Sequence, residues 1–308
     1  SPIVRLAYRA NDQESLLALL SKGGRLLVVR IAADDVAGDH PIIMELPQPK
    51  GAVTALALDA LLENLYVGTA DGQLVHVALS ETESPEMRAA YTVAASSTAV
   101  TTLGFLSGDR SLVVMSEDGA VSTWGLVRRA DAPSGWKLTQ IHTLRPHNAP
   151  VTAFAPSQRV KGFVTGDMKG NLFLHHATSS QTLLRLANSE FPIRAVAFAP
   201  KGDGLIALDG AGQLSLYQVQ NAYPEVTLET LFGKVWYEGY TKPDYVWQST
   251  GGTDDFEAKL SLTPLIYGTL KGTFYALILA IPLALAGALY TSQFMHPRLQ
   301  RWVKPGVE

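Results

Sequence analysis

A pattern of short alternating strands recurs five times in residues 1–230, and it constrains the fold of this 308-residue chain more than any other feature. In each repeat a tight turn containing glycine precedes a strand in which apolar and polar residues alternate. Glycine suits such turns because it reaches positive φ without a steric penalty from a Cβ atom. The turn glycines are Gly24, Gly72, Gly119, Gly170 and Gly212, at spacings of 48, 47, 51 and 42 residues. Four short strands in such a period are typical of one β-propeller blade.

The remaining strands of each repeat follow from the same alternation. First strands are predicted at "IVRLAYR", "VTALALD", "VTTLGFL", "VTAFAPS" and "IRAVAFA". Fourth strands are weaker, and the fifth repeat offers only "VTLETLF", residues 226–232, for that role. The segment "SEDGAVSTW" at 116–124 reads as a hairpin. The sequence therefore predicts an all-β domain of five recognisable blades over residues 1–230.

Two of these repeats resemble WD40 repeats: "LRPHNAPVTAFAPSQRVKGFVTGDMKGNLFLHHA" and "FPIRAVAFAPKGDGLIALDGAGQLSLYQV". His147 stands where that family has the histidine of its Gly-His pair. The family's Trp-Asp ending is reduced to Trp124-Gly125 and Tyr217-Gln218, so the resemblance supplies no acidic partner for His147. WD40-like rings usually have seven blades, and an open ring exposes sheet edges. We therefore expect an incomplete ring here, with one or two further blades preceding Ser1.

The period breaks down at residues 221–262, and we assign residues 231–262 to an aromatic-rich connector. One interpretation is that its aromatic side chains pack on the flank of the propeller or lie near a membrane interface. The alternative is a docking surface for a partner protein, since exposed aromatic residues often anchor interfaces. The aromatic residues of the segment are Phe232, Trp236, Tyr237, Tyr240, Tyr245, Trp247 and Phe256.

Residues 263–295 are predicted to form a transmembrane helix. No charged residue occurs from Gly272 to Met295, and apolar residues lie on every side of the predicted helix. Twenty-odd helical residues match a hydrocarbon core of about 30 Å. A membrane helix tolerates an internal proline such as Pro282 where neighbouring helices satisfy the freed carbonyl. Small residues that allow close helix packing are Gly268, Gly272, Ala276 and Gly287.

The flanking charges predict the orientation of this helix. Arg298, Arg301 and Lys304 follow it, whereas Lys259 and Lys271 precede it. Because basic residues concentrate on the cytoplasmic side, residues 296–308 are expected to form a cytoplasmic turn. The propeller is then expected outside the cytoplasm.

Residues 256–308 resemble the permease subunits of phosphate-type ABC importers. The shared motifs are "YGTL", which is Tyr267, Gly268, Thr269 and Leu270, and the central "IPLA" that contains Pro282. The resemblance implies a subunit of the bacterial inner membrane with the propeller in the periplasm. It also implies a second permease subunit, cytoplasmic ATPase subunits and a periplasmic binding protein as partners. An alternative without transport is a membrane-tethered propeller that serves as a scaffold or sensor in the cell envelope.

The sequence excludes several other kinds of chemistry. It has no cysteine, which removes disulfides, thiolate metal sites and a thiol nucleophile. It has no P-loop, no G-x-S-x-G motif and no H-E-x-x-H motif, so we predict neither an enzyme nor a cofactor. A net charge of −3 gives no support for nucleic-acid binding, and membrane lipid is expected as a partner because of the apolar helix. His175 and His176 are adjacent on a strand, so their side chains should face opposite ways and cannot share a metal ion. The acidic residues of segment 34–40 do not match a calcium-binding loop, because its closing glutamate is absent.

Overall fold

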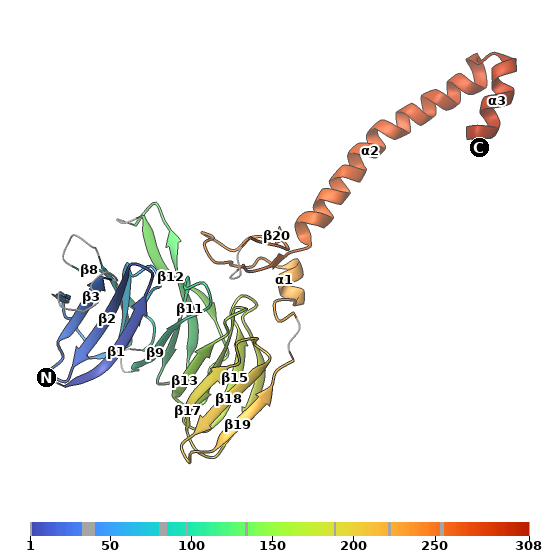
Figure 1. The fold of residues 1–308 in the computed structure, drawn as a ribbon. Coiled ribbons are helices and arrows are strands. Elements are labelled where there is room, and N and C mark those ends of the chain that lie inside the picture. The colour runs from blue at the N-terminus through green and yellow to red at the C-terminus, as the bar shows by residue number, and fades with distance from the viewer. Residues whose placement is uncertain are drawn as a thin grey trace.

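The computed structural model describes residues 2–32, 41–79, 85–95, 98–132, 135–187, 189–220, 223–252 and 256–307. The acid-rich segment 34–40 lies outside these residues, as do Asp254, Asp255 and Glu308. Five antiparallel sheets succeed one another in an arc, and a long helix leads away from them (Figure 1).

Each sheet is one blade, and its strands pair in chain order. The first blade contains β1 (Ile3–Ala10), β2 (Glu14–Ser21), β3 (Leu26–Ala32) and β4 (Ile42–Glu45); the second contains β5 (Val53–Leu58), β6 (Asn64–Thr69), β7 (Gln73–Ala78) and β8 (Glu86–Thr92). The third contains β9 (Val100–Phe105), β10 (Ser111–Ser116), β11 (Val121–Arg128) and β12 (Trp136–Thr143). The fourth contains β13 (Val151–Pro156), β14 (Gly162–Asp167), β15 (Asn171–His176) and β16 (Gln181–Ala187). The fifth contains β17 (Ile193–Phe198), β18 (Gly204–Asp209) and β19 (Leu214–Gln218).

The hydrophobic core lies between successive blades. The first strand of each blade lies beside the first strand of the next, from β1 to β17. Four buried clusters fill the four spaces between adjacent sheets, and each draws side chains from two neighbouring blades. Because each blade buries its faces against its neighbours, the fold is held together by blade-to-blade packing.

The two end blades leave apolar side chains uncovered. On β1, Leu6 and Tyr8 are 58% and 56% exposed, and on β19, Leu214 and Leu216 are 64% and 75% exposed. Within the described residues no further blade covers either face, and the arc is open between β1 and β19 (Figure 1). This agrees with the prediction of five blades in an incomplete ring.

The turn glycines have the conformation that the repeat predicted. The φ angles of Gly24, Gly72, Gly119, Gly170 and Gly212 lie between 76° and 86°. At Gly170 a second requirement is added, because a Cβ atom there would overlap the carbonyl oxygen of Ser189. The predicted hairpin at 116–124 is also present as the β10–β11 pair.

One predicted strand is wrong. Residues 226–232, proposed as the fourth strand of the fifth blade, contain the short helix α1 (Leu228–Phe232). The Thr227 side chain accepts a hydrogen bond from the backbone N–H of Thr230, and the Thr230 hydroxyl accepts one from the N–H of Thr227. This reciprocal capping box starts a helix at a point where the alternating pattern favoured a strand.

His147 has an acidic partner that the sequence did not reveal. Its Nδ1 lies 2.9 Å from Asp167 Oδ2, and its Nε2 lies 2.7 Å from Thr165 Oγ1. The ring stacks on Phe173 with 3.8 Å between centroids. The acid comes from the end of β14 and not from the Trp-Asp position of the family pattern. His147 thus joins the loop before β13 to the β14–β15 turn.

The connector and the C-terminal region follow α1. Residues 235 and 244 form an isolated bridge, and β20 (Trp247–Gln248) pairs with β21 (Lys259–Leu260). Helix α2 (Thr263–Leu289) continues into a π-helical turn, η1 (Tyr290–Phe294). Residues 296–308 were predicted as a turn, but the structure has helix α3 (Pro297–Val307) there. Apolar residues at helical spacing and a proline at the first helical position favour this helix.

Candidate functional site

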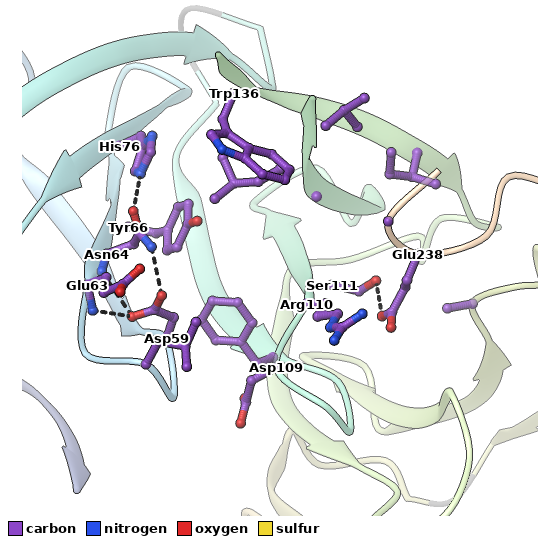
Figure 2. Close-up of a pocket in the computed structure, with 18 of the residues that line it drawn as sticks. Asp59, Glu63, Asn64, Tyr66, His76, Asp109, Arg110, Ser111, Trp136 and Glu238 are labelled. Carbon is purple, nitrogen blue, oxygen red and sulfur yellow. Dashed lines mark hydrogen bonds between the residues drawn. The ribbon is translucent and has the colours of Figure 1, made fainter. Parts of the chain in front are cut away.

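A cavity of about 960 Å³ is lined by residues of the first four blades and of the connector. Figure 2 shows Asp59, Asn64 and His76 along one side of it, with Ser111 and Glu238 on the other. Charged groups of both signs line it: Glu14, Asp59, Glu63, Asp109, Glu238 and Glu257 with Arg30, Arg88, Arg110 and Lys161. A cavity with this lining suits a polar or charged ligand, or side chains of a partner protein.

A buried ion pair fastens the connector to the propeller at one wall. Lys161 Nζ lies 2.6 Å from Glu238 Oε2 and donates to the carbonyl oxygen of Ser107 at 2.5 Å. The other carboxylate oxygen of Glu238 accepts from Ser111 Oγ at 2.5 Å. The side chains of Lys161 and Glu238 are only 5% and 17% exposed. We call Lys161, Ser111 and Glu238 the latch.

A second connector carboxylate lies beside the latch. Burial and, to a smaller extent, the charge of Glu238 raise the pKa of Glu257 to about 7, against the lowering effect of Lys161 and Lys259. Its Oε1 is buried and has no hydrogen-bond partner among the described residues. A protonated carboxyl costs less to bury than a carboxylate. Glu257 therefore exchanges its proton close to neutral pH.

The opposite wall is held by a chain of hydrogen bonds in the second blade. Asp59 accepts from Asn64 Nδ2 at 2.7 Å, and Asn64 Oδ1 lies 2.7 Å from His76 Nε2. Burial and, to a smaller extent, the charge of Arg88 lower the pKa of His76 to about 4. The imidazole is thus neutral at pH 7 and donates to the amide oxygen. The side chains of this wall are therefore held in place by hydrogen bonds to one another.

A further contact secures the connector at β12, the outer strand of the third blade. His142 Nε2 lies 3.1 Å from the carbonyl oxygen of Trp236, and its Nδ1 lies 2.9 Å from Ser180 Oγ. Burial lowers the pKa of His142 to about 4, so the neutral ring donates to the carbonyl and accepts from the hydroxyl. Tyr237, the next residue, is 2% exposed. Part of the aromatic connector therefore packs on the propeller.

Other aromatic residues of the connector face outward. Phe232 is 50% exposed, Trp247 is 41% exposed and Tyr245 is 37% exposed. Lys234 lies over the Tyr245 ring at 5.5 Å from its centroid. The connector thus has one part packed on the propeller and another part with exposed aromatic side chains, and the docking of a partner there stays a prediction.

The two neighbouring histidines of β15 do not form a shared site. His175 Nε2 lies 3.0 Å from Thr165 Oγ1, whereas His176 Nδ1 lies 2.9 Å from Ser179 Oγ. These separate partners match the opposite faces predicted for adjacent strand residues. Among the residues that the structure describes, no group of three histidine, aspartate or glutamate side chains could hold a metal ion.

The motif residues predicted in the apolar segment all lie on α2. Tyr267 and Leu270 are 66% and 64% exposed, and Thr269 Oγ1 donates to the carbonyl of Leu265 at 2.9 Å. Pro282 lies inside the helix, and none of the described α2 residues is buried. The small residues Gly268, Gly272, Ala276 and Gly287 lie along one side of α2 by helical spacing.

The glycines of that row have no neighbour in this structure. A Cβ atom at Gly268, Gly272 or Gly287 would meet nothing within 4 Å. The row is open to a second helix, and its role in packing stays a prediction.

Sequence reasoning missed the residues of the cavity. Lys161 and Glu238 lie 77 positions apart, and neither belongs to a motif with a fixed spacing. The one available signal was the pair of glutamates, Glu238 and Glu257, inside an aromatic segment that was expected to pack on the propeller. Buried carboxylates need cationic or hydrogen-bonding partners, and the propeller supplies them.

The fold is that of a WD40-type β-propeller, joined to a helix that is long and apolar enough to cross a membrane. The chain is similar to the β-propeller domain of Cps50 (Swd1) from Myceliophteria thermophila, at 18% identity and a TM-score of 0.54 over 68% of each chain. It is also similar to the WD40 β-propeller domain of Doa1, at 18% identity and a TM-score of 0.52 over 69% of this chain and 64% of that one. No protein-family profile and no curated protein matches the chain.

Proposed function

We propose that this chain is a membrane-anchored β-propeller that binds proteins outside the cytoplasm. The observation that carries the proposal is the 32-residue helical segment Thr263–Phe294, which contains an 18-residue window with a mean hydropathy of 2.0 and no buried residue. A soluble protein would bury such a helix, because exposed apolar surface of this extent is unfavourable in water. The length of about 48 Å at 1.5 Å per residue exceeds a hydrocarbon core of about 30 Å.

The propeller is proposed to serve as the protein-interaction domain. Its cavity combines charged groups of both signs with the connector residues Trp236, Tyr237 and Tyr240, and other aromatic residues of the connector are exposed. Aromatic residues and arginine are enriched in protein interfaces. The latch and the His142 contact hold the connector against the blades, which keeps this surface preorganised.

In its more specific form, the proposal is a permease subunit of a phosphate-type ABC importer. The support is the order of the motifs on α2, with Tyr267–Leu270 at its beginning and Pro282 near its middle. The partners are then a second permease subunit, ATPase subunits in the cytoplasm and a periplasmic binding protein. The membrane is the bacterial inner membrane, with the propeller in the periplasm. ATP hydrolysis belongs to the partner subunits.

The second candidate is a tethered scaffold or sensor in the cell envelope that transports nothing. It is supported by the same features of the propeller, since neither the cavity nor the latch requires a transport function. Sequencing the gene beyond Glu308 separates the two candidates. Several further apolar segments and a cytoplasmic coupling loop would support the permease, whereas a stop codon near residue 308 would exclude it.

Membrane insertion is tested by two matched double variants. Leu279→Arg with Leu283→Arg places two charges in α2, and Leu214→Arg with Leu216→Arg places two on the equally exposed face of β19. Each arginine at the centre of a membrane helix costs about 2.5–3.5 kcal/mol on insertion scales. The α2 variant is expected to lose its resistance to alkaline extraction from membranes, and the β19 variant to keep it. A topology reporter at residue 230 tests the orientation, and a cytoplasmic signal there would contradict it.

A further inference from the structure

Helix α3 is amphipathic, and its apolar face is uncovered. Leu299, Trp302 and Val303 stand at positions i, i+3 and i+4 and so share one face of the helix. Leu299 is 60% exposed and Trp302 is 86% exposed. Large apolar side chains that share one face of a helix need a partner surface.

The opposite face of α3 is basic. Arg298 and Arg301 are three residues apart and exposed, and no acidic residue occurs between His296 and Val307. The sequence adds Lys304 to the basic residues of this helix. An apolar face with tryptophan and leucine opposite a basic face is the pattern of helices that lie in the headgroup region of a bilayer.

The position of α3 favours the same partner. The extended backbone at Met295, with φ −75° and ψ 134°, ends the helical run, and α3 starts two residues later at Pro297. Figure 1 shows that α3 leaves the axis of α2 at the end remote from the propeller. If α2 spans a membrane, two linking residues hold α3 at the membrane surface.

We propose that α3 lies flat on the cytoplasmic bilayer surface, with Trp302 and Leu299 between the lipid chains and Arg298 and Arg301 on anionic phospholipid headgroups. This inference rests on the proposed membrane insertion of α2. The proposed occupant of the apolar face is lipid because only two residues separate α3 from the end of the proposed membrane helix. The basic face complements the negative charge of phosphatidylglycerol.

The absence of cysteine from the sequence allows a direct test, since each introduced cysteine carries the only label. The full 308-residue chain is reconstituted into phosphatidylcholine vesicles with and without phosphatidylglycerol. An environment-sensitive dye is attached to Trp302→Cys, Leu299→Cys or Arg301→Cys in turn. We expect blue-shifted emission at 302 and 299 and an aqueous spectrum at 301. Uniform aqueous spectra at all three positions in both vesicle types would overturn the proposal.

A charge variant tests the role of the arginines. Arg298→Gln with Arg301→Gln should reduce the ratio of lipid-bound to free α3 about 25-fold in vesicles containing phosphatidylglycerol, a factor of about five for each arginine. Arg5→Gln with Arg194→Gln removes the same charge from exposed propeller positions and should leave that population unchanged. Equal effects of the two double variants would contradict headgroup binding.

A label in α2 separates the possible failures. Dye at Leu279→Cys reports insertion of the membrane helix itself. A lipid-like spectrum at 279 with aqueous spectra at 299 and 302 refutes the inference about α3 and leaves membrane anchoring intact. An aqueous spectrum at 279 refutes both. Blue-shifted spectra at 299 and 302 that do not respond to phosphatidylglycerol would contradict the binding of Arg298 and Arg301 to anionic headgroups.

Discussion

The latch between Lys161 and Glu238 gives the sharpest test of how the connector is held. Lys161→Met keeps the length of the side chain and removes its charge. Glu238 then keeps the Ser111 hydrogen bond but loses its cation, in a place where its side chain is 17% exposed. Breaking a buried ion pair by removing one partner costs about 3–5 kcal/mol. We expect the lower end, about 3 kcal/mol, because some solvent still reaches Glu238.

The loss of stability in Lys161→Met should affect the connector more than the blades. The blade cores do not include Lys161, whereas Glu238 is fixed to the propeller mainly through the latch. Hydrogen exchange in detergent should therefore accelerate at the Val235–Asp244 bridge, which pairs the connector backbone. A change of about 3 kcal/mol corresponds to more than hundredfold faster exchange where local opening controls it.

Two further variants complete this experiment. Lys161→Met with Glu238→Gln should recover part of the loss, because no unpaired charge is then left buried. Arg25→Met breaks the Arg25–Glu45 pair, which has the same kind of charges at 2.9 Å but lies in solvent, and should leave exchange unchanged. If Lys161→Met leaves connector exchange at the wild-type rate, the latch does not hold the connector and the reasoning fails.

Three other predictions concern the connector and the blades. The folded-state pKa of Glu257 lies near 7 and its ordinary value is 4.5, so the unfolded chain loses this proton first as pH rises. The free energy of unfolding should therefore fall between about pH 4.5 and about pH 7. Glu257→Gln should remove this contribution to the pH dependence of thermal unfolding. Gly212→Ala should lower the free energy of unfolding by about 1 kcal/mol, because Gly212 has a left-handed φ but free space around it. Gly170→Ala should lower it by about 3 kcal/mol or more, because the added Cβ atom also meets Ser189. Equal urea midpoints for the two variants would show that φ alone matters. Thr165→Val should cost about 1–3 kcal/mol by leaving nitrogens of His147 and His175 unpaired, and Thr182→Val, which removes one contact to His175, should cost less in the same urea assay.

The sequence predicted features whose cause is local. A left-handed glycine is required wherever a tight turn joins two strands, so Gly24 and its four counterparts give the blade period directly. The apolar run after Gly272 likewise needs no partner to be recognised as a long helix. The strand assigned to residues 226–232 failed because two threonines three residues apart cap a helix, a local signal that the alternation concealed.

Features that depend on distant residues could not be predicted. Asp167 meets His147 because β14 brings it there from 20 positions further along the chain. Lys161 meets Glu238 only after two blades and the connector have assembled. Residues 296–308 were predicted to form a turn, whereas the spacing of Leu299, Trp302 and Val303 fits the helix that forms.

The way in which the connector closes on itself sets the reach of the propeller. A flexible chain as long as residues 231–262 would separate its ends by about 30 Å and let the propeller sample a wide volume above the membrane. Here the backbone N–H of Leu262 donates to the carbonyl oxygen of Leu231 at 2.7 Å, so both ends of the connector meet at the base of α2. The connector is therefore a short stem and not a tether. If α2 spans a membrane as proposed, a protein bound to the blades would be held at one height and in one orientation, which would raise its effective concentration at the membrane surface.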